Sequence, residues 1–257
     1  MARMLTPQAE DFPRWYQDVV AKNFAHAFDI AYTDEHGTLQ RPWQTSWGAS
    51  TRLLGAAIMV HGDDHGLRLP PRVAPVQVVV LVARAGERVI EQAERLVADL
   101  EQAGVRAELD PHSDVSVGRR IVDWELRGVP VRIELGPRDI AAGQVPIALR
   151  ARGEKTTRAL DGLARAIPAI LLAEQDELLR QASELRDRLT SPTATIREAI
   201  EQARVGAARL PWAALGPDGE RRLLEDGISV RCLARSDGEP VDDPDADGVD
   251  AIVARAY

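Results

Sequence analysis

Hydrophobic and polar positions alternate with two different periods along the chain, and the changes of period mark the predicted elements. Residues 12–20 place aromatic and valine side chains at helical spacing, and residues 28–32 then indicate a strand. Turn-forming residues at 34–37 separate it from a return strand over 39–46. A helix is predicted over 50–60. Its expected apolar face comprises Leu53, Ala56, Ala57 and Val60.

A proline-rich joint at 69–75 cannot be helical and precedes a second pattern. Residues 76–82 are apolar but for one glutamine, which is typical of a strand covered on both faces, and residues 88–102 form an amphipathic helix. Further strands are predicted over 105–109, 131–135 and 145–149, and further helices over 119–126 and 155–173, with Pro168 as a possible kink. This alternation predicts an α/β layer fold.

The third part of the chain begins with a helical stretch over 174–189, which Ser191 and Pro192 interrupt. The helix is expected to resume as far as Ala208, and a small acidic α+β tail follows it. The predicted fold class is therefore α/β with α+β. The expected domains are residues 1–73, 74–173 and 174–257.

Composition narrows the class of protein. The 257 residues are 45% hydrophobic and 28% charged, which is typical of a folded globular chain. The longest apolar stretches fall far short of the ~20 residues that span a bilayer, and the first residues do not form a secretory leader. We therefore expect a cytoplasmic protein without a membrane span.

Charge is unevenly distributed around a net value of −8. Residues 111–160 hold nine Arg and Lys against six Asp and Glu, whereas residues 210–257 hold five against eleven. The middle of the chain is therefore the better candidate to face phosphate. Cys232 is the single cysteine, which excludes an internal disulfide, and a buried structural thiol is expected.

Two segments contain residues that could bind a metal ion, but neither has the spacing of a metal site. His61 to His65 contains histidine and aspartate, but the spacing matches no tight metal site, so a capped helix end is expected. Residues 242–248 lack the terminal glutamate of a calcium loop and indicate a solvated acidic loop. No metal site is predicted.

Several ordered sequence strings resemble prolyl-tRNA synthetases. The run QTSWGASTRLLG at residues 44–55, with the segments 61–64 and 66–75, resembles the third signature motif of the class II catalytic domain and its joint to the anticodon-binding domain. The likeness continues through 128–139, 153–155 and the terminal ARAY, and is similar to the form of the family with an extra C-terminal domain.

The resemblance also implies a large internal loss. Residues 6–20 resemble the first helix of these enzymes, and the segment from Asn23 onward resembles a much later part, so the two are joined near Ala21 and Lys22. The first signature motif, which forms the family's dimer interface, and the second, which holds ATP, are absent. The first part is thus expected to be a remnant of the class II antiparallel sheet, and the chain a proline–tRNA ligase homologue that does not complete catalysis by itself.

The resemblance assigns an incomplete nucleotide site and no complete catalytic set. Its candidate residues for binding ATP with Mg²⁺ are Gln44, Thr45, Ser50, Thr51 and Arg52. A helix N-terminus and a guanidinium both suit phosphate. The alternative is that Ser50 and Thr51 merely cap the helix and Arg52 is a surface charge. Family members with this C-terminal domain often hold zinc through several cysteines, so a single cysteine predicts no zinc.

The α/β domain is the part that the family uses to bind the anticodon of tRNA(Pro). Carboxylates and arginines can hydrogen-bond the edges of unstacked guanines. The candidate residues are Glu125, Arg132, Glu134, Arg138 and Lys155. For the basic residues the alternative is solubility and internal ion pairs. Trp124 is expected in the core rather than stacked on a base.

Three functions remain open on the sequence. The first is the ATP-dependent attachment of proline to tRNA(Pro) by a homodimer, as in the intact family. The second is a noncatalytic module that binds tRNA(Pro) without chemistry. The third is a decayed remnant whose unfinished catalytic part exposes apolar surface.

Overall fold

The structure is a computed structural model. It describes residues 23–42, 51–112, 114–235, 241 and 246–255. The chain divides into two compact units, of which one comprises residues 49–184 and the other comprises residues 1–48 together with 185–257.

A five-stranded mixed sheet forms the centre of unit 49–184, with strand order β4-β3-β5-β6-β7. The strands are β3 (Val78–Val82), β4 (Ala107–Asp110), β5 (Val131–Leu135), β6 (Gln144–Leu149) and β7 (Glu154–Ala159). β3 pairs in parallel with β4 and β5, so Val78 lies opposite both Ala107 and Val131. β6 and β7 continue the sheet antiparallel.

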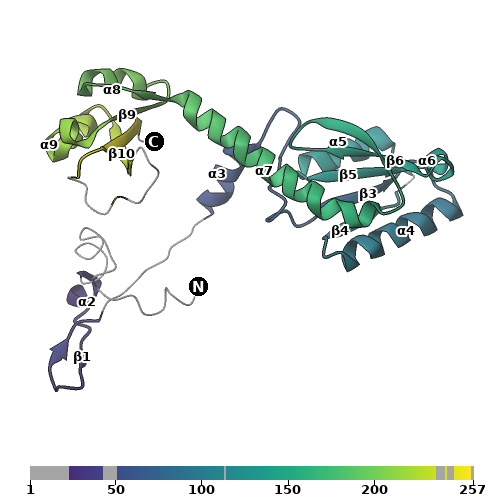
Figure 1. The fold of residues 1–257 in the computed structure, drawn as a ribbon, viewed down its shortest axis with the longest axis horizontal. Coiled ribbons are helices and arrows are strands. Elements are labelled where there is room, and N and C mark those ends of the chain that lie inside the picture. Colours follow the sequence, from purple (N-terminus) through teal and green to yellow (C-terminus); the bar gives the residue numbers. More distant parts are fainter. Residues whose placement is uncertain (1–22, 43–50, 113, 236–240, 242–245, 256–257) are drawn as a thin grey trace. The chain divides into compact units, whose positions relative to one another are not determined.

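Helices cover both faces of this sheet, which explains why every residue of β3 is apolar and buried. The helices are α4 (Glu87–Gln102), α5 (Val117–Leu126), α6 (Pro137–Ala142) and α7 (Leu163–Leu189). Apolar side chains of α4 and α7 pack on one face, and Trp124 of α5 packs on the other. Figure 1 shows α4 running along one side of the sheet.

Helix α3 (Arg52–His61) leads into residues 62–75, which include the proline-rich stretch and are called the joint from here on. Part of this joint lies against the end of α5. At Gly66 the backbone has φ +123°, and a Cβ atom there would come within 2.8 Å of the Leu126 Cα. At Gly128 a Cβ would meet Leu67 at 3.0 Å, and the Leu69 N–H donates to the Gly128 carbonyl. Glycine is required at both positions because the two backbones approach so closely.

The N-terminal part forms a short helix and a minimal hairpin. These elements are α2 (Asn23–Ala27), β1 (Tyr32–Thr33) and β2 (Leu39–Gln40). Asp34 closes the turn, since its carboxylate accepts hydrogen bonds from the backbone N–H groups of His36 and Thr38. The predicted turn at 34–37 is confirmed, but the strands are much shorter than expected.

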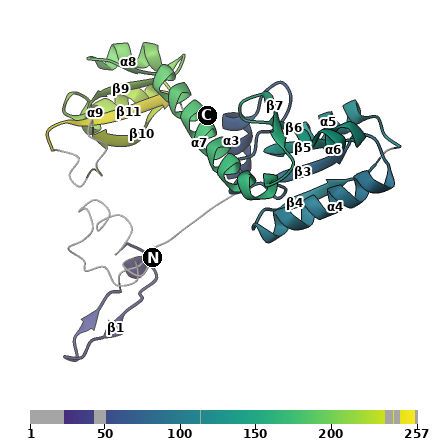
Figure 2. The ribbon, with the colours of Figure 1, turned by 45° about the vertical axis from the view of Figure 1, so that its right-hand side comes forward.

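Residues 190–255 form a second, smaller α+β assembly with its own core. Its elements are β8 (Thr190–Pro192), α8 (Ile196–Ala203), β9 (Ala207–Pro211), α9 (Trp212–Glu225), β10 (Ile228–Arg235) and β11 (Val249–Arg255), with strand order β10-β11-β9-β8. Figure 2 shows α8 and α9 beside these strands. Leu210, Leu223 and Val253 are fully buried between helices and sheet.

The predicted combination of α/β and α+β folds is confirmed, and β3, α4, α5 and β5 lie close to their expected positions. The helix predicted over 155–173 is wrong at its start, because residues 154–159 form β7, and α7 then runs unbroken to Leu189 with Pro168 inside it. The resumed helix ends at Ala203 rather than Ala208. Cys232 is exposed on β10, not buried. The three-part domain division stays a prediction.

Candidate nucleic-acid interface

Four of the five residues predicted to bind the anticodon lie together in one chain of ion pairs. Arg132 and Glu134 are two residues apart on β5 and therefore share a face of the sheet. The Arg132 Nη1 lies 3.1 Å from the Glu125 Oε1 on α5, and its Nε lies 3.3 Å from the Glu134 Oε1. The Lys155 Nζ on β7 lies 2.8 Å from the Glu134 Oε2.

Three of these charged residues, Glu125, Arg132 and Lys155, line a pocket of about 280 Å³. Charged and polar side chains in its wall include His65, Glu125, Arg132, Arg150 and Lys155. Its volume is just below the usual range of about 300–1,000 Å³ for ligand sites. It combines hydrogen-bond donors and acceptors on one concave surface, which is what recognition of a splayed base requires.

Most of the charged groups in this cluster are shielded from water, which costs free energy unless each charge is paired. The side chains of Arg132 and Glu134 are only 11% and 12% exposed, while Lys155 is 53% exposed. Each buried charge has a partner of opposite sign, which offsets the cost of removing it from water. A ligand that binds these groups must replace some of their ion pairs with hydrogen bonds of its own. Only a ligand with donors and acceptors in the right positions can do so, and the cluster therefore favours selective binding.

Arg138 does not join the cluster. It lies on α6 after the end of β5 and is exposed. The chain turns into a helix at Pro137, and Arg138 is not among the residues that line the pocket. It remains suited to a phosphate contact rather than to a base.

Trp124 belongs to the core, as predicted. Its side chain packs with Val79 and Leu81 under the sheet. The indole Nε1 donates to the Asp110 Oδ2 at 2.7 Å, and the Arg127 guanidinium lies 4.7 Å from the ring centre. Both the polar edge and a ring face are thus engaged within the protein.

A buried ion pair behind the pocket was not foreseen. The Arg120 Nε lies 3.0 Å from the Asp110 Oδ1, and its terminal nitrogens donate to the carbonyls of Asp110 and Val82. Burial favours a higher pKa for Asp110, but hydrogen bonds from Arg120 and Trp124 outweigh it and hold the pKa below its ordinary value. This pair fixes α5 against the ends of β3 and β4.

Arg150 is a pocket residue that sequence reasoning missed. Its Nη1 and Nη2 donate to the two Asp63 oxygens at 2.8 and 2.5 Å, and this pair lowers the pKa of Asp63 to about 2. Asp63 therefore forms an ion pair with Arg150, whereas the sequence predicted only that it lies at a capped helix end. His65, two residues further on, reaches the same pocket. Because Asp63 and Arg150 are 87 positions apart, no local pattern signals their contact.

Of the five residues predicted to bind ATP, the structure describes Thr51 and Arg52. Gln44, Thr45 and Ser50 lie outside the described residues. Thr51 precedes α3 and makes no side-chain capping hydrogen bond, and Arg52 is the first residue of the helix and exposed. No α3 residue is buried, and Leu53 and Val60 of its expected apolar face are 64% and 44% exposed. The residues that the structure describes therefore leave this face uncovered.

Comparison with known proteins first defines the class of domain. Residues 77–170, which include β3 to β7 and the start of α7, match the family described as anticodon binding domain. Three of the five predicted anticodon residues, Glu125, Arg132 and Lys155, line the pocket within this stretch, and Glu134 is ion-paired to two of them. The chain thus carries an anticodon-binding domain of this family.

Longer comparisons then identify the relatives. The chain is 49% identical to proline–tRNA ligase 2 of Streptomyces avermitilis and 45% identical to proline–tRNA ligase of Frankia alni. Each match extends over 239 residues, which is 93% of this chain and 51% of the relative. A prolyl-tRNA synthetase of Cryptosporidium parvum, solved with L-proline and AMP, is similar with a TM-score of 0.79 and 28% identity over 92% of this chain and 53% of that one.

These findings confirm that the chain is a homologue of prolyl-tRNA synthetases. It spans about half the length of the curated relatives that it matches. In the part of the chain that the structure describes, no helix is long and apolar enough to cross a membrane.

Proposed function

We propose that this chain binds tRNA(Pro) and selects its anticodon guanines through the pocket beside β5. The observation that carries the proposal is that Glu125, Arg132 and Lys155 line a concave surface of an anticodon-binding domain. Ion pairs link them to one another, with Glu134 between Arg132 and Lys155. Arginine and lysine donate to guanine O6 and N7, and a carboxylate accepts from guanine N–H groups, so both kinds of group have a role.

Equilibrium binding of the full chain tests this function. The ligands are tRNA(Pro) and the same tRNA with its two anticodon guanines replaced, at one fixed salt concentration because phosphate contacts depend on salt. We expect the native tRNA to bind about tenfold or more tightly, the size of one lost base contact. Equal binding of both RNAs would contradict selection at the anticodon.

Paired variants locate the contact. Lys155→Gln removes a half-exposed positive charge and its ion pair with Glu134, and should weaken discrimination between the two RNAs. Arg95→Gln, on the exposed side of α4, is the matched control and should leave it unchanged. Arg138→Gln should weaken binding of both RNAs alike, as loss of a phosphate contact does.

A second candidate function is proline attachment itself, which the names of the relatives and the ligands of the solved synthetase favour. Proline, ATP with Mg²⁺, and a homodimer belong to this alternative, and zinc is not expected in either. We infer that the chain does not form prolyl-adenylate alone, since it spans half the length of its relatives. Proline-dependent pyrophosphate exchange above the background without proline would show it to be a ligase.

A further inference from the structure

The turn between β6 and β7, residues 150–153, forms one wall of the pocket. Arg150 and Gly153 line the pocket from this turn, and Glu154 and Lys155 line it from the start of β7. The position of this short turn therefore decides where the donor groups of the wall lie.

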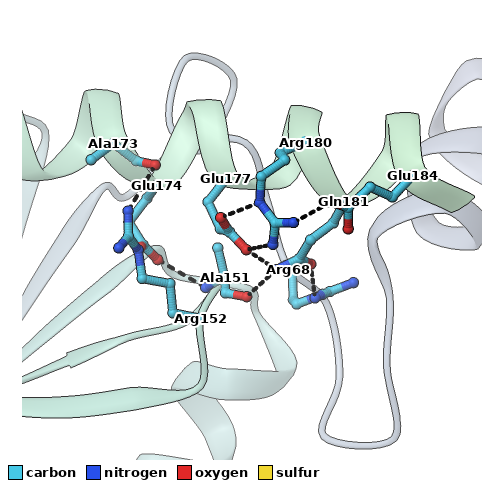
Figure 3. A network of polar contacts seen from close by, with 9 residues as sticks. All are labelled: Arg68, Ala151, Arg152, Ala173, Glu174, Glu177, Arg180, Gln181 and Glu184. Atoms are coloured by element: carbon cyan, nitrogen blue, oxygen red, sulfur yellow. Dashed lines mark hydrogen bonds and ion pairs between the residues drawn. The ribbon is translucent and has the colours of Figure 1, made fainter.

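Helix α7 holds this turn from behind through Glu174. The Glu174 Oε2 accepts the Ala151 N–H at 2.9 Å, and its Oε1 accepts from the Arg152 Nε at 2.8 Å. Two turns along the same helix, the Gln181 Nε2 donates to the Ala151 carbonyl at 3.1 Å. Figure 3 shows these side chains meeting at Ala151, so both backbone polar groups of this residue end on α7.

The same network reaches the joint that follows α3. The Gln181 Oε1 accepts from the Arg68 Nη1 at 2.8 Å, and the Arg68 Nε donates to the His61 carbonyl at 2.6 Å. Asp63 binds Arg150, as described above. The turn is consequently held on one side by α7 and on the other by the joint.

A buried carboxylate is costly for a helix that could pack with apolar groups. Glu174 is 1% exposed, and burial raises its pKa, although the Ala151 N–H and Arg152 oppose the shift. Apolar replacements of buried ion pairs are often as stable or more stable, so fold stability alone does not explain the residue. What Glu174 supplies is a fixed geometry for the turn.

We propose that Glu174 is a positioning residue for RNA selection, because it holds through Ala151 and Arg152 the turn that carries Arg150 and Gly153 to the pocket. This inference rests on the proposed function, since it concerns how the same pocket selects its base. Glu174 itself contacts no RNA: it acts through the turn.

The test compares isosteric acid-to-amide changes on one helix. In Glu174→Gln the amide faces Arg152 in place of a carboxylate, while Asp176→Asn makes the same chemical change at an exposed position two residues away. The measured quantity is the ratio of affinities for tRNA(Pro) and its guanine-replaced form. We expect this ratio to fall by up to about tenfold in Glu174→Gln, toward equal affinity for the two RNAs, because the turn no longer holds the pocket wall in place. The ratio should stay unchanged in Asp176→Asn.

Two further variants separate positioning from stability. Gln181→Met removes the donor to the Ala151 carbonyl and should lower the ratio even if Glu174→Gln does not fold. Leu171→Ala weakens the core under α7 without touching the turn, so its ratio should persist below its unfolding temperature. A normal ratio in Gln181→Met and in any folded Glu174→Gln overturns the inference.

Failure of the proposed function has a different signature. If the unmodified chain does not discriminate between the two RNAs, the pocket is not the anticodon site. Hydrogen exchange of the chain without RNA then tests only whether α7 holds the turn at residues 150–153 in place. Faster exchange of residues 150–153 in Gln181→Met than in Asp176→Asn supports the hold of α7 on the turn, and equal exchange overturns it.

Discussion

Single residues in this chain are constrained most where charge is buried. Asp110 and Arg120 are 4% exposed, and their contact fixes α5 to the ends of two strands. Neither residue is unusual in the sequence, because an aspartate after a strand and an arginine in a helix are ordinary surface residues. Only the fold, which brings them together behind Trp124, makes them part of the core.

Removing one member of this pair is expected to destabilise the fold strongly. Asp110→Asn leaves the Arg120 guanidinium buried without a counter-charge, and we expect a loss of about 3 kcal/mol in the free energy of unfolding. Urea denaturation measures it. The control Arg119→Gln breaks an exposed pair with Asp123 and should cost under about 1 kcal/mol. Similar losses in both variants would contradict this account.

Asp63 gives the chain a pH-dependent contact. Its pKa is lowered to about 2 by Arg150, below its unfolded value, so the pair stabilises the folded state above about pH 4, and this contribution disappears as the pH falls toward 2. We expect Asp63→Asn to be less stable at pH 7 by about 1 kcal/mol, a value reduced for solvent screening. The difference between the two proteins should close as the pH falls toward 2, and a constant difference would refute the assignment.

The candidate site was predictable from the sequence only in part. Glu125, Arg132, Glu134 and Lys155 came from the family resemblance, and the fold then brought them into one set of ion pairs, three members of which line the pocket. Arg150 and His65 escaped because a turn and a distant joint supply them. Contacts between residues far apart in sequence leave no periodic signal.

At the scale of elements, the pattern of apolar residues predicted the helices and strands that bury one or both of their faces. Strand β3 and helix α4 have strong apolar patterns and were found close to their expected bounds. Strand β7 lies at the edge of the sheet, and most of its side chains are exposed. It therefore lacks the alternation of apolar and polar residues that identifies a strand, and was mistaken for the start of a helix.

Two neighbouring leucines on α7 test the packing of this helix. Leu171 is 6% exposed and lies in the core beside the sheet, whereas Leu172 is 54% exposed. Leu171→Ala should cost about 3 kcal/mol, because it leaves a cavity, while Leu172→Ala should cost about 0.5 kcal/mol or less. Chemical denaturation distinguishes them. If the two variants were equally stable, α7 would not pack as described.

At the scale of the molecule, the chain has two compact units and separate apolar cores. One core lies around the five-stranded sheet and the other around β8 to β11. Because cooperative unfolding follows the extent of a packed core, the two parts are expected to open separately.

Hydrogen exchange measured by mass spectrometry tests this independence. Leu223 is fully buried in the C-terminal core, so Leu223→Ala should speed exchange over residues 190–255. Exchange of residues 78–149 should be unaffected. Acceleration throughout both regions would show that the chain unfolds as one cooperative unit instead.

The position of the single cysteine has a practical consequence. Cys232 is solvent-exposed on β10, in the C-terminal assembly, and no other thiol exists in the 257 residues. A maleimide dye therefore attaches to the unaltered protein at one defined atom. Energy transfer from this dye to a fluorophore on tRNA would report how far the C-terminal assembly stays from the bound RNA, without any engineered substitution.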